Sequence, residues 1–106
     1  MTEIVVLESA KADFDDIKAG FKSTHSVARF KQFKQSFRDL FNQIKQFPLA
    51  GVVPDECVTL ELQIRQRIVE DIRVIYEVKD DTVVVRMFLS THRDFLGHLV
   101  ERMLRA

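Results

Sequence analysis

The feature that most constrains the fold is a change in the spacing of apolar residues half-way along the 106-residue chain. Between residues 27 and 47, apolar side chains recur every three or four positions, which is the period of one helical face. They are Val27, Phe30, Phe33, Phe37, Leu40, Ile44 and Phe47. Over residues 58–65 and 71–78 apolar and polar residues alternate, which is typical of half-buried strands. The chain is therefore expected to have separate helical and sheet regions, the α+β class.

The first half is expected to form one strand and two helices. The apolar run over residues 3–8 predicts a strand interior to the sheet, because both of its faces would be apolar. Ser9 is a candidate cap for a first helix, and Ser23 and Thr24 separate that helix from the second. Two helices joined by a short turn form an antiparallel hairpin, and Pro48 ends the second helix.

The second half is expected to form three strands. They span residues 58–65, 71–78 and 82–89. The turn at Lys79, Asp80 and Asp81 is short, so the last two strands should pair as a hairpin. If Asp80 and Asp81 alone form the turn, Ile75 faces Arg86, and Arg73 lies on the same face.

Residues 95–105 predict a closing helix with Asp94 as its cap. The expected order is β-α-α-β-β-β-α in a single domain over residues 1–106. This is an antiparallel four-stranded sheet packed by an N-terminal helical hairpin, with a C-terminal helix.

Composition sets further limits. The 16 Lys and Arg balance the 16 Asp and Glu, but residues 17–47 hold seven basic residues against Asp39 alone. The single cysteine, Cys57, excludes an internal disulfide, so a reducing cytoplasm is expected. No apolar run reaches the ~18 residues of a membrane span, and the start lacks the basic residues of a signal peptide.

Four segments, in this order, resemble the RelE/ParE family of bacterial type II toxins. They are residues 8–17 (ESAKADFDDI), 47–51 (FPLAG) with Val53 and Pro54, 67–85 (RIVEDIRVIYEVKDDTVVV) and 92–94 (HRD). The spacing from Arg67 to Arg73 is especially similar to the YoeB branch. The resemblance covers most of the chain and implies a growth-inhibiting toxin neutralised by a co-transcribed antitoxin.

The resemblance leaves the mechanism open between branches that share the fold. The RelE and YoeB branches cleave mRNA in the ribosomal A site without a metal, whereas the ParE branch inhibits DNA gyrase and has no agreed catalytic residues. The first hypothesis is a ribosome-dependent mRNA endonuclease, with antitoxin, ribosome and mRNA as partners and no cofactor, metal or membrane. The alternatives are a ParE-like gyrase inhibitor, or a degenerate member that only binds its antitoxin.

Metal-free RNA cleavage needs a base, an acid and cations that stabilise the phosphorane. Arg73 matches the family's phosphate-contacting arginine, and His92 lies close to the terminal histidine of the YoeB branch. Arg93 could hold a phosphate. The base would be Glu56 or Glu61. Arg73 and His92 are expected to be exposed, although each has an ordinary interpretation as a surface residue.

Other basic residues are candidates for RNA phosphates. They are Arg65, Arg67 and Arg86 near the sheet, and Arg29, Lys31, Lys34 and Arg38 on the second helix. The helical set would grip ribosomal RNA, unless it is only a solvated face. One departure counts against RelE-type chemistry, because the positions of that branch's strand lysines hold Thr59 and Glu61.

Overall fold

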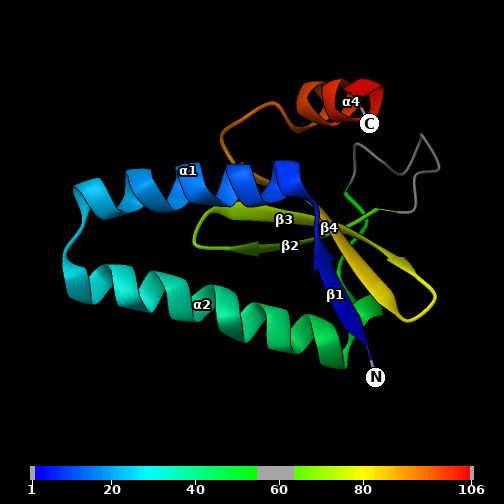
Figure 1. The fold of residues 1–106 in the computed structure, drawn as a ribbon, viewed down its shortest axis with the longest axis horizontal. Coiled ribbons are helices and arrows are strands. Elements are labelled where there is room, and N and C mark those ends of the chain that lie inside the picture. Colours follow the sequence, from blue (N-terminus) through cyan, green and yellow to red (C-terminus); the bar gives the residue numbers. More distant parts are fainter. Residues whose placement is uncertain (1, 55–63, 106) are drawn as a thin grey trace.

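The computed structural model describes residues 2–54 and 64–105. A four-stranded sheet lies between a helical hairpin on one face and a single helix on the other (Figure 1). The elements are β1 (Glu3–Val6), α1 (Glu8–Thr24), α2 (Val27–Gln46), the short 3-10 helix η1 (Pro48–Ala50), β2 (Arg65–Val69), β3 (Ile72–Lys79), β4 (Thr82–Ser90) and α4 (Phe95–Arg105).

The helical hairpin is confirmed, with different ends. Helix α1 begins at Glu8, so Ser9 lies inside it and does not cap it, and it continues through Thr24. The cap that forms belongs to α2, where the Ser26 side chain accepts a hydrogen bond from the Arg29 N–H at 3.1 Å. This bond satisfies one of the free donors at the helix start.

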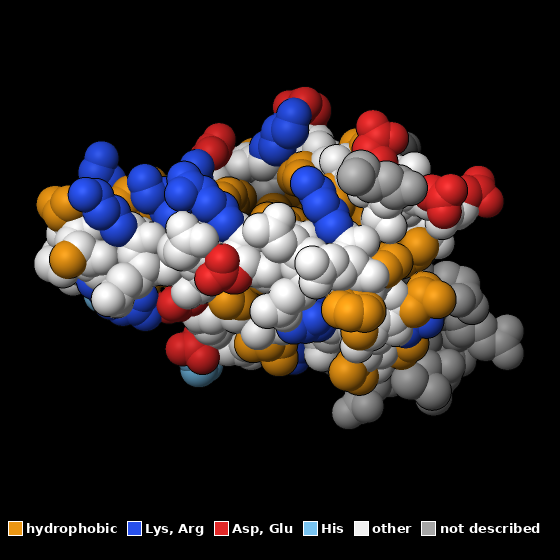
Figure 2. All heavy atoms as spheres, turned by 90° about the horizontal axis from the view of Figure 1, so that it is seen from below, with side chains coloured by type: hydrophobic (Ala, Val, Ile, Leu, Met, Phe, Trp, Pro, Cys, Tyr) orange, Lys and Arg blue, Asp and Glu red, His pale blue; other side chains and the backbone are white. Residues whose placement is uncertain are grey.

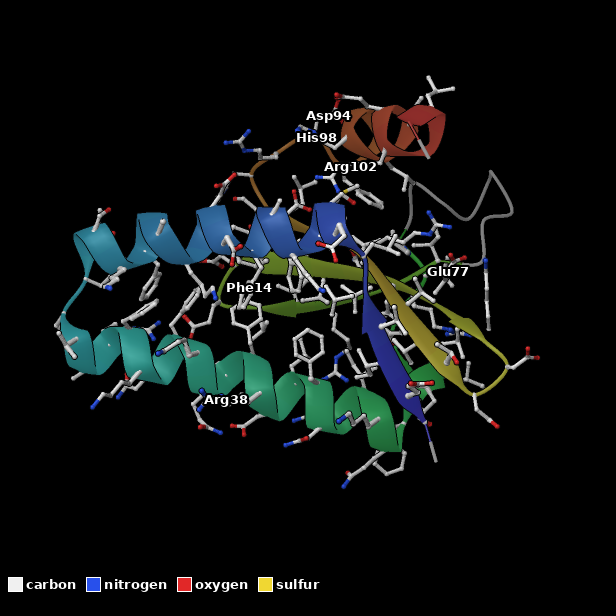
Figure 3. All side chains as sticks on the ribbon, viewed as in Figure 1. Phe14, Arg38, Glu77, Asp94, His98 and Arg102 are labelled. Carbon is white, nitrogen blue, oxygen red and sulfur yellow. The ribbon has the colours of Figure 1, made fainter. Side chains whose placement is uncertain are left out.

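The phenylalanine stripe of α2 forms the larger core. Phe33 and Phe37 are buried, and the ring of Phe14 lies 4.8 Å from Phe37 and 4.8 Å from Phe88. Figure 3 shows Phe14 pointing from α1 toward α2. Only the ends of the stripe are exposed, at Val27 and Phe47. The hairpin is thus held to the sheet by aromatic packing.

The expectation of a fully antiparallel sheet is wrong. The strand order is β1-β4-β3-β2, and β1 pairs with β4 in parallel, with Glu3 beside Thr82. A parallel pair needs a long crossover, and here the whole segment between the two strands supplies it. Strand β1 lies at an edge of the sheet, not in its interior, and its residues alternate between exposed and half-buried.

The strand that pairs with β3 also differs from the expectation. Residues 58–63 of the expected strand lie outside the described residues, and β2 begins only at Arg65. A two-residue turn, Glu70–Asp71, joins β2 to β3. Both turn residues have positive φ, at 54° and 60°, as the tight turns that suit twisted hairpins require.

The β3–β4 hairpin turns at Asp80–Asp81 as expected, but its register changes part-way along. Tyr76 pairs with Val85, whereas Ile75 pairs with Met87. Arg86 is therefore an extra residue, and the expected pairing of Ile75 with Arg86 is wrong. Such a bulge moves every later side chain to the opposite face, so Met87 and Leu89 face α4 while Phe88 faces the hairpin.

Helix α4 closes the second face of the sheet. Asp94 caps it as expected, because its Oδ1 accepts a hydrogen bond from the Gly97 N–H at 3.2 Å. Phe95 and Leu99 are buried in a second apolar cluster with Ile75 of β3. Within the described residues, no helix is both long and apolar enough to cross a membrane.

Candidate functional site

Arg73 lies on the α4 side of β3, where it is half-buried rather than exposed. The ring of Phe95 lies over its guanidinium, with 5.3 Å between Cζ and the ring centroid. Its Nη1 donates to Oε1 of Gln66 on β2 at 3.3 Å. The cation that the resemblance assigns to the phosphate therefore has internal contacts with α4 and β2.

Arg86 shares that face and is paired with a carboxylate. Its Nε donates to Oε1 of Glu77 at 2.7 Å, and its Nη2 lies 2.5 Å from the same oxygen. The Glu77 side chain is only 12% exposed and the Arg86 side chain 29%. An ion pair that is partly withdrawn from water is weakly screened by salt, so Glu77 largely neutralises Arg86.

His92 and Arg93 lie in the loop between β4 and α4, and both are exposed as expected. Their backbone N–H groups bind Ser90, at Oγ and at the carbonyl oxygen. In the described part of the chain, neither side chain has a hydrogen-bonding or ionic partner. These two residues remain available to a ligand.

A cleft of about 520 Å³ lies between α1 and the β4–α4 connection. Its walls include Arg93, His98 and Glu70, and its apolar surfaces include Phe21 and Phe33. Arg73, Arg86 and His92 do not line it. Arg93 therefore lines this cleft, whereas Arg73 and Arg86 on the sheet face under α4 do not.

One wall of the cleft holds an ion pair that sequence reasoning missed. Asp13 of α1 accepts a hydrogen bond from Arg102 of α4, and its other oxygen accepts one from the Phe88 N–H at 3.2 Å. Figure 3 shows Arg102 on the side of α4 that faces α1. No local pattern could have indicated this pair, because its members are 89 positions apart.

Arg29 is not free to bind RNA phosphates. Its guanidinium makes two hydrogen bonds to Glu70, at 2.5 Å and 3.3 Å, and Ser36 donates to the same carboxylate at 3.1 Å. The hydrogen bond from Arg29 holds the pKa of Glu70 below its usual value, against the opposing effect of burial. This network fixes the β2–β3 turn to the start of α2.

The two arginines of β2 also make internal contacts. Arg65 donates to the carbonyl oxygens of Leu49 and Gly51 at 3.1 and 2.9 Å. Arg67 donates to Oε1 of Gln43 at 2.7 Å. Both side chains support the segment after α2, and neither is presented as a free cation.

The remaining helical candidates do face solvent. Lys31 and Arg38 are exposed, and Figure 3 shows Arg38 projecting from α2 away from the sheet. Lys34 is half-buried, with its Nζ 4.8 Å from the centroid of the Phe30 ring. These cations could meet an anionic partner.

The candidate bases Glu56 and Glu61 lie outside the described residues. Within the described ranges, no group of three or more His, Cys, Asp or Glu is arranged to hold a metal ion. Of the proposed catalytic residues that the structure describes, His92 and Arg93 are exposed, and Arg73 packs against the ring of Phe95.

Comparison with known proteins decides the family. Residues 4–95 match the family model described as the ParE toxin of the type II toxin-antitoxin system, parDE. The chain belongs to the ParE toxin family. Membership confirms the resemblance to RelE/ParE toxins, and a ParDE-type toxin implies an antitoxin partner. No curated protein matches the sequence.

Two solved structures share the fold of this ParE-family chain. A chain from the chromosomal ParDE TA system of P. aeruginosa superposes with a TM-score of 0.65 at 15% identity, covering 85% of this chain and 96% of its own. A copper-bound mutant toxin from Helicobacter pylori has a TM-score of 0.54 at 17% identity, covering 85% of this chain and 94% of its own.

Proposed function

We propose that this ParE-family toxin arrests growth by binding DNA gyrase rather than by cutting mRNA. The observation that carries the proposal is the contact of Phe95 with Arg73, together with the pairing of Arg86 with Glu77. The gyrase target itself comes from the ParE branch of the resemblance.

Phosphorane stabilisation depends on cations that already point at the site where charge develops. Here the Phe95 ring already lies over one face of the Arg73 guanidinium, and Gln66 accepts a hydrogen bond from its Nη1, so a phosphate that binds there has to compete with these contacts. Arg86 would also have to leave Glu77, and because the Glu77 carboxylate is little exposed, losing this partner is costly even though Lys79 Nζ lies 3.7 Å away. Inhibition by binding requires neither rearrangement.

The mRNA endonuclease remains the second candidate, and one observation favours it. Arg73, Glu77 and Arg86 share one sheet face, which brings two cations and a carboxylate together. His92 is exposed in the following loop, where its imidazole could act as the acid. This function requires a phosphate to displace the internal contacts of Arg73 with Phe95 and Gln66.

The test measures both activities of the purified wild-type toxin. Gyrase supercoiling of a relaxed plasmid is assayed beside primer extension on mRNA bound to ribosomes. We expect inhibited supercoiling and intact transcripts. Cleaved transcripts with normal supercoiling would overturn the proposal. A toxin that neither cleaves transcripts nor inhibits supercoiling would also overturn it, in favour of the degenerate member that only binds its antitoxin.

A matched variant makes the comparison sharper. His92→Gln removes an exposed imidazole that has no side-chain partner among the described residues, so the fold should be unaffected. A nuclease that uses His92 as its acid should lose about 10²–10⁴-fold in rate. We expect the variant to inhibit gyrase and arrest growth as the wild type does.

A further inference from the structure

Four basic residues form one stripe along α2. They are Lys31, Lys34, Arg38 and Lys45. Their separations of 3, 4 and 7 positions place them on one side of the helix. At 1.5 Å per residue, the stripe extends for about 21 Å. Figure 2 shows Lys and Arg side chains gathered on this surface, mainly over the first half of α2.

This basic stripe is not neutralised within the described structure. None of its four members forms an ion pair there, whereas Arg29, Arg86 and Arg102 each have a carboxylate partner. Asp39, the one acidic residue of α2, is hydrogen-bonded to Gln35 at 2.9 Å. The stripe therefore presents several uncompensated positive charges to solvent.

Three large apolar side chains follow directly after the stripe. Phe47, Leu49 and Val52 are 64%, 64% and 65% exposed. Phe47 is the C-cap residue of α2, two positions after Lys45 in the sequence, so the apolar group begins at the end of the helix that carries the basic stripe. Figure 2 shows apolar side chains gathered toward this end of α2.

The backbone that carries these apolar side chains is held in place. The Tyr76 hydroxyl donates to the Pro48 carbonyl at 3.1 Å, and burial raises the pKa of Tyr76. Arg65 binds the carbonyls of Leu49 and Gly51. Val52 and Gln66 exchange two backbone hydrogen bonds, at 3.1 and 2.7 Å.

A built-in glycine completes this support. A Cβ on Gly51 would collide with the Tyr76 hydroxyl, so the close approach of the turn to the sheet requires glycine. Because this turn is already ordered in the free protein, binding a partner here loses little backbone conformational entropy. Exposed apolar side chains on an ordered turn are typical of a contact surface.

We propose that the basic stripe and the exposed trio Phe47, Leu49 and Val52 together bind an acidic, amphipathic segment of the antitoxin. This α2 docking surface rests on the toxin-antitoxin pairing of the family and extends it to named residues. Acidic side chains of the partner face the stripe, and its apolar side chains cover the trio.

The apolar trio is the reason to choose a protein segment over a nucleic acid. Phosphate backbones are recognised by cations and polar groups. A base could stack on Phe47, but it would leave the aliphatic side chains of Leu49 and Val52 uncovered. A protein segment meets both parts, since apolar anchors flanked by charges are the ordinary composition of interfaces. A segment about 21 Å long, roughly four helical turns, spans the stripe.

Two variants of the purified toxin test the surface. The probe is the antitoxin, taken as the product of the gene next to the toxin gene. Lys31→Glu with Arg38→Glu reverses the charge of two exposed members of the stripe. Phe47→Ser with Leu49→Ser removes two apolar anchors without touching the backbone contacts. Dissociation constants are measured by calorimetry at about 0.15 M salt, and gyrase inhibition is measured without the antitoxin.

Each variant has a matched control. Lys11→Glu with Lys79→Glu makes the same change in net charge on α1 and β3, at side chains 57% and 66% exposed. Val100→Ser with Leu104→Ser removes two exposed apolar residues from α4. The controls should bind the antitoxin as the wild type does.

We expect each surface variant to bind the antitoxin at least tenfold more weakly and to inhibit gyrase normally. Unchanged antitoxin binding in both variants, at normal thermal stability, would overturn the proposal. Lost gyrase inhibition with normal antitoxin binding would also overturn it, by assigning the surface to the target. A wild-type toxin that binds the antitoxin but spares gyrase contradicts only the proposed function.

Discussion

The ring of Phe95 lies over the guanidinium of Arg73, with 5.3 Å between the Arg73 Cζ and the ring centroid. This contact joins the first residue of α4 to the middle of the sheet. An arginine face against an aromatic ring is a favourable interaction, and here the ring also shields one side of a half-buried cation. The same side chain thus has a structural role on the face where the family resemblance implies chemistry.

Arg73→Ala should lower the free energy of unfolding by about 1–2 kcal/mol, since it removes the cation–π contact and the packing of the side-chain stem. The expectation that this residue is exposed would have implied no loss. Urea denaturation measures the change. Arg93→Ala, which removes an exposed arginine, should stay within about 0.5 kcal/mol of the wild type. Equal stability of the two variants would contradict the packing of Phe95 on Arg73.

Phe37→Ala should destabilise the protein by about 3–5 kcal/mol, because the ring is buried between α1 and the sheet and its loss leaves a cavity. Thermal and chemical denaturation measure this loss. The control is Phe47→Ala, where the ring is 64% exposed and a change within about 0.5 kcal/mol is expected. A Phe37→Ala variant with the wild-type melting temperature would refute the assignment of this stripe to the core.

Asp13→Ala should cost about 1–3 kcal/mol, because it leaves the Phe88 N–H and Arg102 without their acceptor. The amide protons of α4 should also exchange faster, since Asp13 ties that helix to α1. Asp15→Ala is the control, as its exposed pair with Lys18 at 3.6 Å contributes little. Equal amide hydrogen exchange rates in α4 of both variants would contradict a stabilising role for the Asp13–Arg102 ion pair.

Glu70→Gln should lower stability by about 1 kcal/mol at pH 7, because it keeps a hydrogen-bond acceptor but removes the charge that faces Arg29. The folded protein holds the pKa of Glu70 below its usual value of 4.5. The carboxylate therefore stabilises the fold above that value, and its contribution is lost as pH falls through the lowered pKa. The difference between wild type and variant should shrink below about pH 4.5. A difference that stays constant from pH 7 to pH 3 would show that the charge of Glu70 contributes nothing.

Local periodicity predicted much of the architecture. The spacing of Phe33 and Phe37 identified the buried face of α2, because helical geometry converts a repeat of three to four residues into a single stripe. Alternation identified β3, and the short turn at Asp80–Asp81 indicated where β4 follows it. The family was also within reach of the sequence, since it rests on short segments in a set order.

Long-range relationships decided the rest. The apolar run of β1 contains nothing that specifies its partner or direction, so its parallel pairing with β4 appears only when the chain folds. The bulge at Arg86 changes the side-chain phase of β4 without any local signal such as glycine or proline.

The candidate site divides in the same way. The sequence by itself identified which arginines and histidines stand near the ends of strands, because that follows from position along the chain. Only the tertiary structure decided which of them are free, since neutralising partners come from distant segments. Glu70 reaches Arg29 across 41 positions, and α4 covers Arg73 from the far end of the chain. The energy of a charged side chain depends on what lies within a few ångströms of it in space, and separation along the sequence does not contain that information.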